Sequence, residues 1–177
     1  MKGLTVFNIT RGLNGKDSSV AYVKGGQRSN MVPDYCETGI SGHNKEELMK
    51  KIDAFVQSRK FNLKYEVKDE LLILKSYGQS AHVSTPELGK NAIMQSLICL
   101  CDADVCSGDI RESVIFLAET MGLETKGKSF RVCLHDAVSG YLSFNVDTID
   151  MDKERITLFL NLSYPVTKTF EDMMKPI

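Results

Sequence analysis

A chain of 177 residues is long enough for one domain with a sizeable core, or for two small subdomains. Its 22 basic and 23 acidic residues give a formal net charge of −1 and are scattered, which argues against a nucleic-acid-binding surface. No apolar run approaches membrane-spanning length, the N-terminus lacks the pattern of a secretion signal, and the number of cysteines is odd. We therefore expect a cytoplasmic protein with reduced thiols and no membrane partner.

The first half of the chain is predicted to combine strands with two helices. Asn44 is a good cap for the first helix, with Glu47 three residues further on, and Thr85 is expected to cap a second helix that continues through Leu100. The predicted strands, of which the first two are expected to form a hairpin, are residues 4–10, 20–23, 35–41, 63–67 and 71–74. This order of elements predicts an antiparallel sheet with both helices on one face.

The second half is predicted to repeat this mixture of helices and strands. A third helix is expected near Asp109, where Glu112 completes a capping pattern, and Gly122 is expected to end it. The later elements are strands at residues 141–146 and 156–162 and a short helix at 169–174. The sequence thus predicts an α+β domain whose antiparallel β-sheet has helices packed on one face. The similar order of the two halves permits, but does not require, two similar subdomains side by side.

His82 lies on a short loop flanked by small residues, between a predicted strand and a predicted helix. Two rigid elements hold a side chain at such a place while leaving it free to reach outward. A lone histidine more often only satisfies neighbouring backbone groups. The local pattern therefore leaves a structural and a functional role open.

The sequence has no arrangement of residues that is typical of a zinc site. Catalytic zinc needs about three protein ligands, whereas His43, His82 and His135 are far apart and no His-x-Asp or paired-Glu pattern occurs. Cys99 and Cys101 are one residue apart near a predicted helix end, so their side chains should point in different directions. We expect no metal bound by this chain and regard a cysteine metal site as the weaker alternative to buried thiols.

Four segments resemble one family of enzymes. Residues 80–92, SAHVSTPELGKNA, resemble the lid-domain motif of the zinc metallopeptidases that include carnosinase, carboxypeptidase G and aminoacylase, and are most similar to bacterial PepV-type dipeptidases. Val83 departs from this motif, because relatives usually have glycine there. The other segments that resemble PepV-type dipeptidases are residues 25–33 (GGQRSNMVP), 135–142 (HDAVSGYL) and 161–167 (NLSYPVT).

The resemblance implies a role for three residues. The histidine that matches His82 enters the active site from the lid and helps to stabilise the oxyanion, and the asparagine that matches Asn30 faces the substrate. Ser163 stands where the family has an arginine that binds the free carboxylate of the substrate. A hydroxyl group cannot reproduce a bidentate guanidinium contact, so recognition of the C-terminus of a dipeptide is in doubt. Ser163 is equally compatible with a plain exposed serine on a strand.

The resemblance implies that residues 1–177 are the lid domain of a metal-dependent dipeptidase, without the catalytic metal-binding domain. The partners would be a short peptide substrate and the missing catalytic domain of the same polypeptide, which would hold the zinc; no nucleic-acid partner is expected. The isolated chain should then be inactive. The alternative is a non-catalytic binding or protein-interaction module on the same fold, which Ser163 and the missing metal ligands favour.

Overall fold

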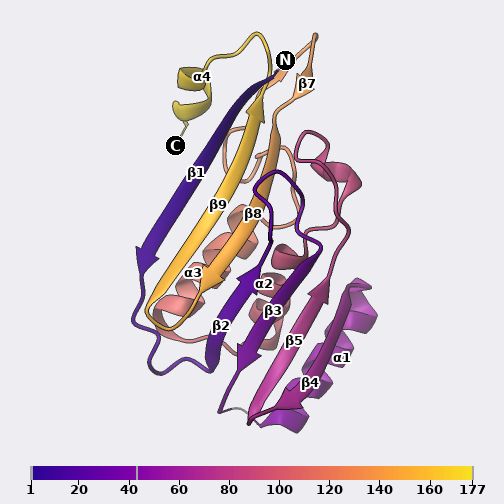
Figure 1. Ribbon diagram of the computed structural model, residues 1–177, viewed down its shortest axis with the longest axis vertical. Helices are drawn as coiled ribbons and strands as arrows, with labels where there is room; N and C mark the ends of the chain where they lie inside the picture. The colour runs from indigo at the N-terminus through magenta and orange to yellow at the C-terminus, as the bar shows by residue number, and fades with distance from the viewer. Residues whose placement is uncertain (1, 43, 177) are drawn as a thin grey trace.

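Seven strands pair into one antiparallel sheet in the computed structural model, which describes residues 2–42 and 44–176 (Figure 1). In spatial order the strands are β1 (Gly3–Gly12), β9 (Arg155–Tyr164), β8 (Ser143–Met151), β2 (Val20–Gly25), β3 (Tyr35–Ile40), β5 (Leu71–Tyr77) and β4 (Asn62–Lys68). A separate small ladder joins β6 (His135–Asp136) to β7 (Gly140–Tyr141). The helices are α1 (Lys45–Arg59), the 3-10 turn η1 (Pro86–Leu88), α2 (Ala92–Ala103), α3 (Gly108–Thr120) and α4 (Phe170–Met174).

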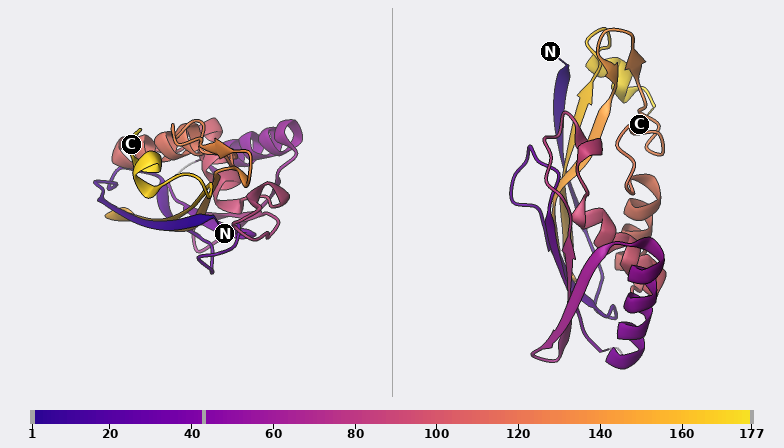
Figure 2. Two further views of the ribbon diagram at one scale, coloured as in Figure 1. Left: turned by 90° about the horizontal axis from the view of Figure 1, so that it is seen from above. Right: turned by 90° about the vertical axis from the view of Figure 1, so that its right-hand side faces the viewer.

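The long helices lie on one face of the sheet, as the second view in Figure 2 shows. α2 is the central helix and contacts β3, β5 and β8 of the sheet as well as α1 and α3. It is apolar on almost all sides, which is the pattern of a helix buried between two layers. α1 instead buries a single stripe, made by Leu48, Ile52 and Phe55. This arrangement confirms the predicted α+β class.

The predicted hairpin of the first two strands is wrong. β1 pairs along its whole length with β9, the last strand, whereas β2 pairs with β3 and β8. The connection from β1 to β2 crosses the turn between β8 and β9, where the Leu13 and Gly15 N–H groups donate to the Glu154 and Lys153 carbonyls. The local turn pattern correctly indicated that the chain reverses after β1. It could not show that β1 pairs with the distant strand β9 instead of with β2.

α2 begins later than predicted. Thr85 makes no side-chain capping bond, and the residues after it form only the short turn η1. The true cap is Asn91, whose side chain accepts a hydrogen bond from the Met94 N–H at 3.1 Å. The loop that leads from β5 to α2 is closed by two backbone hydrogen bonds of 2.9 Å that Gln79 and Lys90 exchange. The residues around His82 are therefore a closed loop rather than the first turn of a long helix.

Other helix starts agree with the sequence or are explained by distant contacts. Asn44 caps α1 as predicted, and His43, which was expected to precede it, lies outside the described residues. Ser107 rather than Asp109 takes the cap position of α3. The Asp109 carboxylate instead accepts a hydrogen bond of 2.8 Å from the backbone N–H of Asn14.

The two halves of the chain share a single sheet. Residues 23–25 of β2 pair with residues 149–151 of β8 and so join the strands of the first half to those of the second. The two subdomains that the sequence permitted are thus two parts of one layer. Within the described part of the chain, no helix combines the length and apolarity needed to cross a membrane.

Candidate functional site

A groove of about 1000 Å³ brings the three candidate residues together. Its wall includes Asn30 from the segment between β2 and β3, His82 from the closed loop after β5, and Ser163 from β9. β1 contributes the exposed side chains of Leu4 and Val6. In Figure 2 the segment between β2 and β3 lies on the face of the sheet away from the helices.

Backbone hydrogen bonds fasten the Asn30 segment to the His82 loop. The Val83 N–H donates to the Asn30 carbonyl at 3.2 Å, and the Val32 N–H donates to the Ala81 carbonyl at 2.8 Å. Together these two bonds form one isolated antiparallel bridge, in which Met31 pairs with His82. Two irregular segments that are far apart in the sequence therefore position each other.

The imidazole of His82 is exposed and has one local partner. Its Nδ1 accepts a hydrogen bond from the Ser84 backbone N–H at 3.1 Å and lies 2.8 Å from the Ser84 hydroxyl. Because a backbone N–H can only donate, this contact favours the tautomer that carries its proton on Nε2. The loop thus satisfies one ring nitrogen and leaves an N–H donor available to a ligand.

Ser163 lies on the predicted face of β9. Leu160 and Leu162 belong to the core, whereas Asn161 and Ser163 line the groove, as strict alternation along a strand requires. Ser163 is 7% exposed and stands opposite Ser143 of β8. It is therefore a buried wall residue, which corrects the reading of a plain exposed serine.

Below the groove lies a polar cluster that the sequence analysis did not single out. Asp147 is fully buried, and its carboxylate accepts hydrogen bonds from the Nδ2 atoms of Asn145 at 2.6 Å and Asn161 at 3.5 Å. Burial raises the pKa of Asp147 to about 7, against the opposing effect of these two donors. Asp147 occupies an irregularity in β8, since the pairing register shifts between Val146 and Thr148. The signal in the sequence was an aspartate in the middle of a strand, where aspartate is disfavoured.

This cluster also holds the segment that carries Asn30. Asn161 donates to the Ser29 carbonyl at 3.2 Å, and Asn145 donates to the Met31 carbonyl at 3.4 Å. The two side-chain amides therefore donate hydrogen bonds to the backbone on both sides of Asn30 and also to the Asp147 carboxylate. The arrangement makes Asp147 a positioning residue for the groove, although it does not itself line the wall.

A second carboxylate, Asp136, holds Ser139, which lines the groove. Asp136 accepts hydrogen bonds from the backbone N–H and hydroxyl of both Ser139 and Thr167. Burial acts to raise the pKa of Asp136, but these donors hold it well below its usual range. The carboxylate ties the β6–β7 ladder to the segment after β9. The ring of His135 packs at a tilt of 51° against Tyr141, with ring centroids 4.4 Å apart; Tyr141 lines the groove, whereas His135 does not.

The described side chains form no group that fits zinc. Among residues 2–42 and 44–176, no group of three or more His, Cys, Asp and Glu side chains could hold a metal ion. Burial raises the pKa values of the Cys99 and Cys106 thiols to about 12, so both stay protonated at neutral pH. These two thiols therefore lack the thiolate character of a reactive cysteine.

Comparison with known proteins indicates similarity to dipeptidases. The chain is 27% identical over 178 residues to a "Putative dipeptidase" of Staphylococcus epidermidis and 25% identical over 177 residues to the Beta-Ala-Xaa dipeptidase of Lactobacillus delbrueckii subsp. lactis; each alignment covers 97% of the chain. The "Putative dipeptidase YtjP" of Bacillus subtilis is 29% identical over 143 residues, or 80% of the chain. The chain spans 31% to 38% of the length of these relatives. No protein-family model matches the sequence.

Proposed function

We propose that this chain is the substrate-covering lid domain of a metal-dependent dipeptidase. The single observation that carries the proposal is the groove in which Asn30, His82 and Ser163 meet although they are far apart in the sequence. The names of the relatives support hydrolysis of short peptides as the reaction of the longer polypeptide. Zinc would be held by residues outside this chain, in the catalytic domain of the same polypeptide.

His82 would stabilise the tetrahedral oxyanion of the scissile amide. The Ser84 N–H occupies Nδ1, so the Nε2–H of the neutral ring is directed by the loop and is free to donate. A donor that is already oriented needs no rearrangement when negative charge develops on the oxygen, which is the basis of oxyanion stabilisation. Asn30 would bind and orient the substrate from the neighbouring segment, to which the His82 loop is hydrogen-bonded.

The test uses the longer polypeptide that contains both this chain and a catalytic domain. Loss of one oxyanion donor lowers turnover roughly a hundredfold to a thousandfold. We expect His82→Ala to lower kcat by this factor with little change in KM. His135→Ala is the matched control, because His135 does not line the groove, although its ring contacts the wall residue Tyr141, and its loss should leave kcat nearly unchanged. An unchanged kcat with a raised KM for His82→Ala would make His82 a binding residue only.

The buried position of Ser163 favours a second candidate function, which is peptide binding without catalysis. A serine in the groove wall cannot form the bidentate contact with a carboxylate that an arginine would supply. On this observation the chain would be a non-catalytic module that binds peptides without hydrolysing them. A longer polypeptide that binds a dipeptide with measurable affinity and shows no metal-dependent hydrolysis would support this second function against the first.

A further inference from the structure

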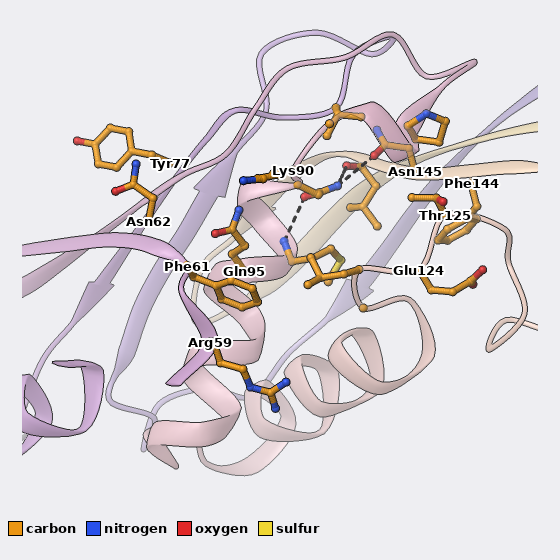
Figure 3. A pocket seen from close by; sticks show the side chains of 18 of the residues that line it. Arg59, Phe61, Asn62, Tyr77, Lys90, Gln95, Glu124, Thr125, Phe144 and Asn145 are labelled. Carbon is orange, nitrogen blue, oxygen red and sulfur yellow. Dashed lines mark hydrogen bonds between the residues drawn. The ribbon is translucent and has the colours of Figure 1, made fainter. Parts of the chain in front are cut away.

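A second cavity, of about 350 Å³, lies on the helix side of the sheet (Figure 3). It is formed by the start of α2, the residues that connect α1 to β4, the segment that follows α3, and the core side of β8. Phe61 and Phe144 contribute aromatic walls, and Gln95 of α2 lies in the cavity near Phe61. The volume is in the range of pockets that hold small organic molecules.

Gln95 is the first sign that this cavity is built for a ligand. The residue is only 3% exposed, and among the described residues no hydrogen bond joins its side-chain amide to a partner; the amide faces the cavity rather than the closed core. The amide is thus available to form a hydrogen bond with a ligand that enters the cavity. A ligand with a polar group facing Gln95 would form this bond.

The charges at the edge of the cavity are the second sign. Figure 3 shows Arg59 and Lys90 at opposite edges, with Gln95 between them. In the described part of the chain neither cation forms an ion pair, whereas the carboxylate of Glu124, which also lines the cavity, accepts backbone hydrogen bonds from Lys126 and Lys128 at 2.6 and 2.7 Å. The lining carries three cations, Arg59, Lys60 and Lys90, against one carboxylate, so its net charge is positive.

We propose that this cavity binds a small aromatic carboxylate. The ring would contact Phe61 and Phe144, and the carboxylate would face Lys90 and accept a hydrogen bond from the Gln95 amide, while Arg59 adds positive charge at the far edge. An aromatic ring suits the mainly apolar wall, and an anion suits the unpaired cations. This inference concerns the helix side of the sheet and does not depend on the proposed peptidase function.

The test titrates the 177-residue chain with 2-naphthoate and, as a neutral match of the same shape, 2-naphthamide. A ligand of this size should bind with a dissociation constant on the order of 1 mM, which amide chemical-shift changes in NMR can measure. We expect the largest changes near Phe61, Gln95 and Thr125, and weaker binding of the amide.

Single substitutions test the contributions of Gln95 and of the positive charge separately. Gln95→Leu removes one hydrogen bond at similar volume and should weaken 2-naphthoate binding roughly threefold to tenfold. Lys90→Gln, an exposed substitution that should not disturb folding, should weaken it about twofold to fivefold. Lys50→Gln, an equally exposed change on the outside of α1, is the control and should have no effect. Equal binding of the naphthamide, shift changes centred elsewhere, or unaltered binding in the Lys90→Gln protein would overturn the proposal.

Discussion

Replacing Asp147 by asparagine should remove a specific pH dependence of stability. In an unfolded chain an aspartate has a pKa of about 4, whereas burial raises the pKa of Asp147 to about 7 in the folded protein. Between these values the folded state holds a proton that the unfolded state has lost. The contribution of Asp147 to the free energy of unfolding is therefore fully present below about pH 4. It falls as the pH rises to about 7 and then levels off. Three pKa units correspond to about 4 kcal/mol at most.

Asparagine is the informative substitution because it keeps the shape of the side chain and cannot ionise. Its Oδ1 can still accept the hydrogen bond that Asn145 donates to the carboxylate at 2.6 Å. The variant should therefore lack the decline between pH 4 and pH 7. At pH 8 it should be more stable than the wild-type chain, since no buried carboxylate has to be charged there.

Urea unfolding at pH 4.5, 6, 7 and 8 measures the effect directly. The quantity of interest is the difference in the free energy of unfolding between variant and wild type, which should increase steadily with pH. Asp150→Asn is the control, since Asp150 is an exposed residue of the same strand and its loss should leave the slope unchanged. Parallel pH profiles for Asp147→Asn and the wild type would refute the reasoning.

Three further outcomes are expected. Ser163→Arg in the longer polypeptide should raise kcat/KM for a dipeptide more than for its C-terminal amide, because a guanidinium binds a free carboxylate through charge-assisted bonds; equal gains on the two substrates would place Ser163 away from the carboxylate. Ile93→Ala removes a fully buried side chain of α2 and should destabilise the chain by about 2–5 kcal/mol in urea unfolding. The isolated chain should unfold in one cooperative thermal transition, followed by circular dichroism, and should not hydrolyse dipeptides with or without added zinc.

Local patterns in the sequence were enough for most of the secondary structure. Alternating residues predicted the strand that became β9, and the same alternation placed Asn161 and Ser163 together on one face. A capping residue predicted the start of α1 because the bond it makes joins neighbouring residues. The resemblance to dipeptidases likewise used short contiguous motifs, and it identified three side chains that the fold brings into one groove.

The groove itself was decided by contacts between distant residues. β1 pairs with β9 because the last strand offers it ten successive partners, and no local pattern contains that information. The same is true of Asp147, whose pKa depends on burial below a segment that lies far away in the sequence. A sequence therefore determines which residues alternate, cap and turn, since these depend on near neighbours. Pairing partners, burial and the field around a charge depend on what the rest of the chain places beside them, and only the tertiary structure supplies that.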